Sequence, residues 1–402
     1  GGMKVREEIR IKQAMCEYAV KRLSCFQFGS FLYIGEKKTE VRAMKITKVK
    51  IEKFSAPLKE PFRVAFGVIE DADSWTVKIE TDEGIYGLGS AAPSAFVTGE
   101  TMDTCYIVMK MFADAFIGFD PMDIAGAHKL MDSIIYSNGA AKCAFDLALY
   151  DIIGKKKGLP VYKVLGGTNP VVHNDITIGI NAPEKMEADA KEYVFEKGFR
   201  ILKVKTGLDL ATDIRALTLI RNAVGPDVRI RIDANQGYSV ETALKALPEF
   251  EKLGIDAAEQ FLPWWDFEGA AELKRKNTTS VKLMLDESIH NIHDAHRAAK
   301  LDCADFYNIK LMKCGGLYYG AQIADIAEEA GVGCMVGCMQ ENKISIAAGV
   351  SLVAAKKAIV EADCDSFMFY KGDDDGIAGG FTREGGVFTL LDKPGLGLDY
   401  DI

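Results

Sequence analysis

VRIRIDANQGYSVETALKALPEFEKLGIDAAE (228–259) contains one complete structural repeat. The apolar-rich run 228–232 is followed by an amphipathic helical pattern over 239–253, which stops at Gly254 before a second apolar run, 255–258. Short apolar runs bounded by turn residues are typical of buried strands, and glycine commonly ends a helix. The stretch therefore predicts a β-α-β unit.

The same unit recurs through the C-terminal half of the chain. Strand-like runs occupy 175–180, 199–204, 228–232, 255–258, 281–285, 306–309, 333–336 and 359–362. Helical patterns lie between them, among them 183–197, 239–253 and 318–330. Eight strands alternating with helices predict an α/β fold of the (β/α)8-barrel type. A doubly wound sheet uses the same alternation, but residues 181–183 after the first strand are Asn-Ala-Pro, without a GxGxxG loop.

The region before the barrel has a different organisation. Residues 45–57 and 74–81 alternate apolar and polar side chains, and helical patterns follow. They predict antiparallel strands and helices in an α+β domain over 44–170. The helical patterns cover 101–116, 121–134 and 140–156. A barrel over 171–375 and a C-terminal segment, 376–402, then complete the chain.

Residues 1–43 begin Gly-Gly-Met and lack the uninterrupted apolar stretch of a signal peptide. We expect an appended or upstream-translated extension, or alternatively an arm that makes contacts in an oligomer. The role of these residues stays open.

Composition limits the classes of protein. Of the 402 residues, 48% are hydrophobic and 27% are charged, which excludes a disordered or collagen-like chain. The net charge of −9 argues against a nucleic-acid partner, and the absence of any run of 18 apolar residues argues against a membrane partner. Nine scattered cysteines indicate reduced thiols in a cytoplasmic protein.

Charged residues directly follow five consecutive predicted strands. They are Lys205, Asp233, Glu259, Asp286 and Lys310, and successive members are 24 to 28 residues apart. Active sites of such barrels lie at the C-terminal ends of the strands. Any one of these residues could belong to an exposed loop, but five in register indicate a functional site, because charges are rarely buried unless they are paired or metal-bound.

The three carboxylates Asp233, Glu259 and Asp286 have no histidine or cysteine ligand near them at the strand ends. An all-oxygen set of this kind suits Mg²⁺. The sequence therefore predicts a magnesium site at the barrel mouth.

Lysines flank the predicted metal from both sides. Lys203 and Lys205 share one face of the second strand, and two adjacent ammonium groups make it easier for one of them to lose its proton. Lys310 approaches from across the barrel. One lysine could remove a proton next to a carboxylate while the other returns it on the opposite face.

Several motifs occur in order along the chain. They are LKVKTG (202–207), RIDANQG (231–237), DES (286–288), NIKLMKCGG (308–316) and KPGLG (393–397). They resemble the enolase superfamily, most of all its muconate-lactonizing subgroup, over nearly everything from residue 44 onward. The resemblance implies that 44–170 caps the barrel and that the C-terminal segment returns to this cap. It also implies an acid/base pair, Lys205 and Lys310, with Lys203 as electrostatic helper, and one Mg²⁺ per subunit on Asp233, Glu259 and Asp286. We expect a homo-oligomer.

Asp363 and Asp365 distinguish between members of the subgroup. Two carboxylates at the end of strand eight resemble the Asp-x-Asp of dipeptide epimerases, which binds the α-ammonium of the substrate. The resemblance implies Mg²⁺-dependent 1,1-proton transfer, through an enolate, at the α-carbon of the C-terminal residue of an L,L-dipeptide. The alternatives are a muconate cycloisomerase, an o-succinylbenzoate synthase, an N-succinylamino acid racemase or a non-catalytic relative. The two acids could also be solvated loop residues.

Four further residues are expected to contact the substrate: Phe66, Gly67, Met339 and Gln340. Phe66 and Gly67 begin an expected capping loop, 66–71, in which Ala-Glu epimerases place an arginine at the position of Gly67. Gln340 is polar where that group often has an apolar residue. These departures favour dipeptides other than L-Ala-L-Glu.

Overall fold

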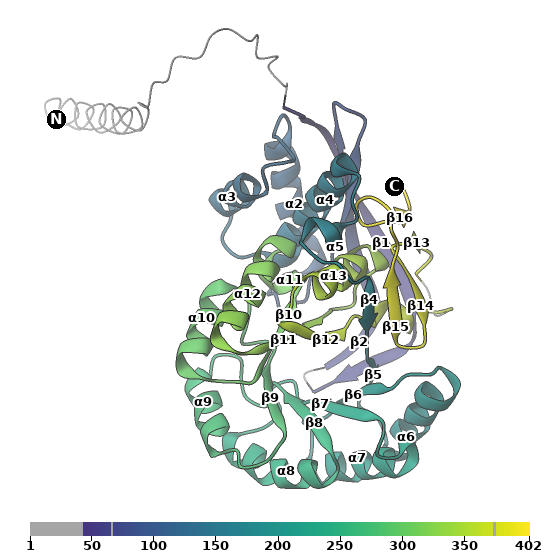
Figure 1. Ribbon diagram of the computed structural model, residues 1–402, viewed down its shortest axis with the longest axis vertical. Coiled ribbons are helices and arrows are strands. Elements are labelled where there is room, and N and C mark those ends of the chain that lie inside the picture. Colours follow the sequence, from purple (N-terminus) through teal and green to yellow (C-terminus); the bar gives the residue numbers. More distant parts are fainter. Residues whose placement is uncertain (1–42, 66, 373–374) are drawn as a thin grey trace, which may run out of the picture. The chain divides into compact units, whose positions relative to one another are not determined.

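The computed structural model describes residues 43–65, 67–372 and 375–402. Its barrel sheet has eight strands in the order β12-β11-β10-β9-β8-β7-β6-β5 (Figure 1). The strands are β5 (Ile176–Ile178), β6 (Ile201–Lys205), β7 (Arg229–Asp233), β8 (Ile255–Glu259), β9 (Lys282–Leu285), β10 (Phe306–Lys310), β11 (Gly333–Gly337) and β12 (Ile359–Asp363). Each adjacent pair is parallel.

The first and last strands close the ring through the residues that flank them. The backbone N–H of Asp175 donates to the carbonyl of Ala362 at 3.2 Å. The N–H of Thr177 donates to the carboxylate of Asp365 at 2.7 Å. The predicted (β/α)8-type barrel is confirmed, and the predicted strands differ from the observed ones by at most a few residues at either end.

Helices follow the strands and surround the barrel (Figure 1). They are α6 (Pro183–Lys191) with a π-helical continuation (Glu192–Glu196), α7 (Leu210–Val224), α8 (Val240–Lys252), α9 (Phe267–Lys276), α10 (Ile292–Leu301), the short α11 (Leu311–Cys314), α12 (Leu317–Ala330) and α13 (Lys343–Ala355). Side chains cap several of them: Asp209 and Ser239 accept hydrogen bonds from the first turns of α7 and α8. Each helix thus begins soon after a strand ends, which leaves only short loops at the mouth.

The cap consists of a three-stranded antiparallel sheet and helices. The strands are β1 (Ile46–Val64), β2 (Gly67–Thr81) and β3 (Tyr86–Ala91), and the helices are α2 (Met102–Phe116), α3 (Ile124–Ile134), α4 (Gly139–Lys157) and α5 (Val161–Val164). Helix α4 lies directly on β3. A Cβ atom on Gly89 would lie 1.8 Å from the carbonyl oxygen of Ala144, so this approach requires glycine.

The first hairpin is longer than the sequence predicts. Val64 pairs with Gly67 and Arg63 with Val68, so most of the expected capping loop 66–71 belongs to β2. The register is irregular between Pro57 and Phe62, a stretch that interrupts the alternation on which the shorter strand was predicted. Phe66 lies outside the described residues.

The C-terminal segment contacts both the barrel entry and the cap. Strands β14 (Phe381–Glu384) and β15 (Val387–Leu390) form a sheet with β4 (Val171–His173), and β13 (Ala378–Gly379) pairs with β16 (Leu398–Asp399). The N–H of Leu396 donates to Asp151 of α4 at 2.8 Å. These contacts agree with a tail that returns to the cap, whereas the domain boundaries at 170 and 375 stay a prediction. Within the described ranges, no helix is both long and apolar enough to cross a bilayer.

Candidate active site

Five consecutive strands, β6 to β10, place one charged side chain each at the mouth of the barrel. Register pairs the ends of neighbouring strands: Lys205 lies beside Asp233, and Asp233 beside Glu259. All five predicted residues, including Asp286 and Lys310, are at most 7% exposed. They are therefore buried together and are not exposed loop residues.

The three carboxylates form one oxygen-lined cluster. One oxygen from each of Asp233, Glu259 and Asp286 lies within 4.8 Å of the others. Glu259 Oε2 and Asp286 Oδ2 are buried, and their partners are ammonium groups: Lys203 Nζ at 2.8 Å and Lys310 Nζ at 2.7 Å. A buried set of carboxylate oxygens without a nitrogen or sulfur ligand fits a hard divalent cation such as Mg²⁺.

Lysines reach this cluster from two sides. Lys205 Nζ lies 2.6 Å from Asp233 Oδ2, and Lys310 Nζ lies 2.7 Å from Asp286 Oδ2. Lys203 lies between the carboxylates, 2.8 Å from Glu259 Oε2, 3.2 Å from Asp233 Oδ2 and 2.7 Å from Asp363 Oδ2. The two lysines predicted as an acid/base pair thus come from β6 and β10, on either side of the carboxylates.

Charges within the cluster shift the pKa values of its members. Burial would lower the pKa of Lys203, but the surrounding carboxylates, Asp363 first, raise it well above its ordinary value. Asp286 similarly raises the pKa of buried Lys310. Lys203 is therefore not the member of the Lys203–Lys205 pair that loses its proton more easily, because opposite charges outweigh the neighbouring ammonium group.

The pKa values of the three carboxylates do not all shift in the same direction. Burial, and then Asp233, raise the pKa of Glu259 to about 7. Burial would also raise the pKa of Asp286, but Lys310 and Lys313 lower it well below its ordinary value. The neighbouring ammonium groups therefore decide which carboxylate is most strongly anionic.

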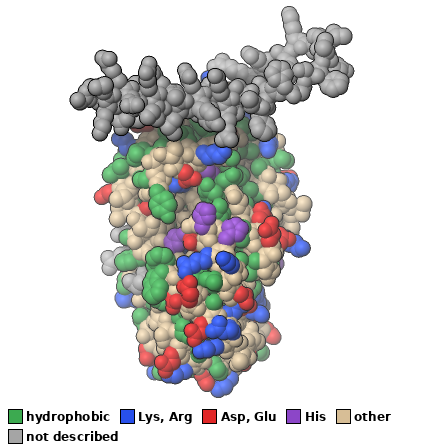
Figure 2. All heavy atoms as spheres, turned by 90° about the vertical axis from the view of Figure 1, so that its left-hand side faces the viewer, with side chains coloured by type: hydrophobic (Ala, Val, Ile, Leu, Met, Phe, Trp, Pro, Cys, Tyr) green, Lys and Arg blue, Asp and Glu red, His purple; other side chains and the backbone are tan. Residues whose placement is uncertain are grey.

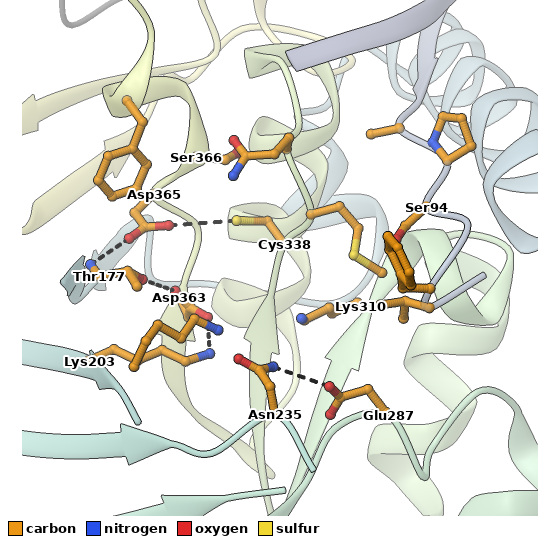
Figure 3. Close-up of a pocket in the computed structure, with 18 of the residues that line it drawn as sticks. Ser94, Thr177, Lys203, Asn235, Glu287, Lys310, Cys338, Asp363, Asp365 and Ser366 are labelled. Carbon is orange, nitrogen blue, oxygen red and sulfur yellow. Dashed lines mark hydrogen bonds and ion pairs between the residues drawn. The ribbon is translucent and has the colours of Figure 1, made fainter. Parts of the chain in front are cut away.

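Asp363 and Asp365 form a second acidic group at the end of β12. Both are buried, so they are not solvated loop acids. Thr177 orders the pair: its N–H donates to Asp365 at 2.7 Å and its hydroxyl to Asp363 at 3.3 Å (Figure 3). Burial, and then Asp363, raise the pKa of Asp365 to about 7. Lys203 keeps the pKa of Asp363 below its ordinary value in spite of burial.

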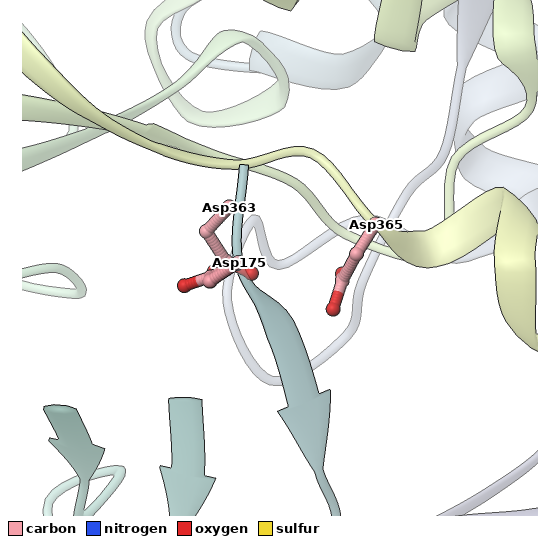
Figure 4. Close-up of side chains that lie close together, drawn as sticks. All are labelled: Asp175, Asp363 and Asp365. Carbon is pink, nitrogen blue, oxygen red and sulfur yellow. The ribbon is translucent and has the colours of Figure 1, made fainter. Parts of the chain in front are cut away.

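Asp175 is a third carboxylate in this acidic group that the sequence analysis missed. Figure 4 shows it near Asp363 and Asp365, and one oxygen from each of the three lies within 4.8 Å of the others. Arg231 Nε lies 2.9 Å from Asp175 Oδ2. Asp175 directly precedes β5, whereas the residues predicted for the site follow their strands.

Other buried polar residues around the carboxylates were also missed. Lys313, in α11, donates to Asp286 Oδ1 at 2.5 Å and to the carbonyl of Asn308 at 3.0 Å. Asn235 donates to Glu287 at 3.1 Å. The motif NIKLMKCGG contains a second lysine, Lys313, after Lys310, and this was the available signal. Its position in the sequence did not indicate that it pairs with Asp286.

A cavity of about 200 Å³ lies at the barrel mouth, and the three lysines and the pair Asp363 and Asp365 line it, whereas Asp233, Glu259 and Asp286 are not among its lining residues. Asp363, Asp365 and Thr177 lie on one side of it, and Lys310 and Ser94 lie on the other (Figure 3). The remaining lining residues are Val68, Asp73, Ala92, Pro93, Phe96, Val97, Lys203, Lys205, Asn235, Glu287, Cys338, Met339, Gln340, Ser366 and Phe369.

Two of the expected specificity residues, Met339 and Gln340, line this cavity. Gly67 begins β2, and its neighbour Val68 lines the cavity. The cavity can accommodate a small molecule that places a cation near the acidic pair and a carboxylate near the metal ligands.

Comparison with known proteins identifies both parts of the chain. Residues 46–166 match the family described as mandelate racemase/muconate lactonizing enzyme, N-terminal domain, and residues 185–401 match the enolase C-terminal domain-like family. A hydrophobic dipeptide epimerase of Enterococcus faecalis is 39% identical over 89% of this chain and 100% of its own. An N-succinyl-L-Arg/Lys racemase of Bacillus cereus is 36% identical, over 89% and 95%.

Solved structures agree with these sequence matches. The E. faecalis dipeptide epimerase complexed with Mg and L-Leu-L-Tyr has a TM-score of 0.85 at 39% identity, over 89% of this chain and 100% of that one. A substrate-liganded L-Ala-D/L-Glu epimerase of Bacillus subtilis has a TM-score of 0.85 at 35% identity, over 88% and 99%.

Proposed function

The chain belongs to the mandelate racemase/muconate lactonizing enzyme family of enolase-like proteins, and on this premise we propose that it is a Mg²⁺-dependent dipeptide epimerase. The observation that carries the proposal is the acidic pair Asp363 and Asp365, buried in the same cavity as Lys205 and Lys310. A free α-ammonium bound at this pair would hold a dipeptide with its second residue toward the lysines.

The metal would be held by Asp233, Glu259 and Asp286, one ion per subunit. When bound, Mg²⁺ offsets the negative charge that develops on the carboxylate end of the substrate. The buried cluster of oxygens, one from each carboxylate and all within 4.8 Å of one another, supports this assignment.

Lys205 and Lys310 would exchange the proton at the α-carbon of the second residue. One removes it from one face of the α-carbon, and the other delivers a proton to the opposite face, which inverts the configuration. Lys203 stays charged, because the carboxylates around it raise its pKa, and it would stabilise the enolate electrostatically.

The acidic pair also weighs against the other reactions of the subgroup. N-succinyl amino acids and muconate carry negative charge where a dipeptide has its ammonium group, and like charges near Asp363 and Asp365 would repel them. The racemase among the relatives makes N-succinyl amino acids the appropriate comparison substrates.

The test is to incubate the protein and Mg²⁺ with a library of L,L-dipeptides in D2O and to follow deuterium at the C-terminal α-carbon by mass spectrometry. We expect exchange and the L,D-epimer with at least one group of dipeptides, and none with their N-succinyl counterparts. Absence of exchange from every dipeptide would overturn the proposal, as would exchange from N-succinyl amino acids alone.

We also propose that the protein is a cytoplasmic homo-oligomer. Seven cysteines among the described residues are free, six of them buried, which suits a reducing compartment such as the cytoplasm.

Trp264 and Trp265 are more than half exposed, as at a surface available to a second subunit. On the coloured part of the face in Figure 2, acidic and basic side chains are interspersed and do not form the broad basic patch of a nucleic-acid-binding surface. Light scattering of the full chain tests the oligomeric state.

A further inference from the structure

The three predicted metal ligands share one pattern of contacts. Each carboxylate directs one oxygen to a lysine of the site: Lys205 for Asp233, Lys203 for Glu259 and Lys310 for Asp286, at 2.6, 2.8 and 2.7 Å. The other oxygen accepts a hydrogen bond from a separate donor: the backbone N–H of Asn235 for Asp233, Nδ2 of Asn308 for Glu259 and Nζ of Lys313 for Asp286, at 2.9, 2.7 and 2.5 Å. The separate donor fixes the orientation of each carboxylate and so determines where the remaining oxygen points.

Glu259 depends on its separate donor more than the two aspartates do. Among the described residues, Asn308 is the one donor to Glu259 Oε1, and Lys203 is the one partner of Oε2. Asp233 and Asp286 each have two ammonium partners. A glutamate side chain also has one more rotatable bond than aspartate, so more orientations are open to it once a hydrogen bond is lost. The orientation of Glu259 therefore depends on one neutral hydrogen bond and one ion pair.

Asn308 is held firmly in the barrel wall. Its side chain is fully buried in β10, and its carbonyl accepts from Lys313 Nζ at 3.0 Å. A Cβ on Gly337 of β11 would lie 2.6 Å from Asn308 Oδ1, so the amide packs closely against the backbone of β11. Nδ2 is the atom that faces Glu259, because an ionised carboxylate can only accept. The amide therefore has little freedom to turn away from the carboxylate.

The other end of this amide has no partner. Asn308 Oδ1 is buried and accepts no hydrogen bond from the described residues, which costs free energy. An apolar side chain of similar size would avoid this cost, so packing alone does not account for an asparagine here. Asn308 also begins the motif NIKLMKCGG, and it is not among the residues that line the cavity. Its contribution therefore lies in the bond to Glu259 and not in contact with a substrate.

We infer that Asn308 is a positioning residue, which holds Glu259 in the orientation that Mg²⁺ binding requires. This inference rests on the metal site of the proposed function. It adds a residue that acts on this site through Glu259.

The test is isothermal titration of the chelator-treated full chain with Mg²⁺ alone. Asn308→Leu removes the donor at similar side-chain volume and should raise the Kd for Mg²⁺ by about 10- to 100-fold. Asn277→Leu is the matched control, and its Kd should equal that of the unaltered protein. Asn277 Nδ2 also donates one hydrogen bond, to the carbonyl of Val281 at 2.9 Å, but the residue lies at the end of α9 and outside the cavity lining.

A second measurement is the deuterium exchange of one dipeptide as a function of Mg²⁺ concentration. In Asn308→Leu, the Mg²⁺ concentration for half-maximal exchange should rise by the same factor as the Kd. Saturating Mg²⁺ should restore most of the exchange rate, because the defect lies in metal affinity. A purely structural role would lower the exchange rate without changing its dependence on Mg²⁺.

An unchanged Kd in folded Asn308→Leu would overturn the inference, and so would a loss of exchange that saturating Mg²⁺ does not restore. If Asn308→Leu does not fold, Asn308→Ala, which adds no bulk, is titrated in its place. An unaltered protein that binds Mg²⁺ but exchanges no dipeptide would refute the proposed function, and the titration would still decide the role of Asn308. An unaltered protein that binds no Mg²⁺ would overturn the inference itself.

Discussion

Asp365→Asn should lower kcat/KM for a dipeptide, and the size of the loss should depend on pH. The substitution keeps an oxygen that can accept the N–H of Thr177, which lies 2.7 Å from the carboxylate, but it removes the charge opposite the substrate's ammonium group. A hydrogen bond to a charged group contributes about 1.5 to 3 kcal/mol. A loss of about 2 kcal/mol corresponds to a decrease of about 30-fold in kcat/KM.

The pKa of Asp365, raised to about 7 by burial and then by Asp363, sets the pH range. Because this pKa is raised, the carboxyl group is charged above about pH 7 and neutral below it. It is about nine-tenths ionised at pH 8 and about one-hundredth ionised at pH 5. The unaltered enzyme should therefore exceed Asp365→Asn by about 30-fold at pH 8 and by less than about twofold at pH 5.

The assay is kcat/KM from pH 5 to 8, measured as deuterium exchange of one dipeptide at constant ionic strength. Asp363→Asn is the comparison variant. In spite of burial, Lys203 keeps Asp363 charged by lowering its pKa, and this charge adds to burial in raising the pKa of Asp365. Asp363→Asn should therefore shift the decline in activity at low pH to a lower pH. A constant ratio between the unaltered enzyme and Asp365→Asn across this range would refute the reasoning, and so would full activity of the variant at pH 8.

Three other perturbations have defined outcomes. Lys313→Met removes an ammonium group that lies 2.5 Å from the buried carboxylate of Asp286. The free energy of unfolding, measured by urea titration without Mg²⁺, should fall by about 3 kcal/mol. An unchanged midpoint and slope of the titration would contradict this. Gly89→Ala would place a Cβ 1.8 Å from the carbonyl oxygen of Ala144, so we expect a destabilisation of about 3 kcal/mol by the same titration. Gly84→Ala, where nothing lies within 4 Å and the cost comes only from a φ of +75°, should lose about 1 kcal/mol, and equal losses in the two variants would contradict this. Chelation by EDTA should abolish exchange and lower the melting temperature, and added Mg²⁺ should restore both; exchange that persists after chelation would exclude the metal role.

The sequence was sufficient to predict the barrel and the residues at its mouth. Parallel strands end at one edge, so reading the residue after each apolar run placed Lys205, Asp233 and Glu259 side by side, and β6, β7 and β8 pair them in that order. The pattern works because a buried strand is apolar until the point where it meets the site.

Features that depend on distant contacts could not be predicted in the same way. Asp175 precedes its strand, and it joins Asp363 and Asp365 only because the barrel closes between β5 and β12. The high pKa of Lys203 likewise depends on carboxylates from other strands. The length of the β1–β2 hairpin was missed because Pro57 interrupts the alternating pattern, although its pairing resumes at Phe62.

We propose above that Lys205 and Lys310 exchange a proton on opposite faces of one α-carbon. The most direct measurement is α-proton exchange in D2O, with Mg²⁺, of matched L,L- and L,D-dipeptides by Lys205→Ala and Lys310→Ala. We expect each variant to exchange one stereoisomer and not the other, with opposite stereoisomers for the two variants, and we expect neither variant to epimerise its substrate. Equal exchange of both stereoisomers by Lys310→Ala would contradict it.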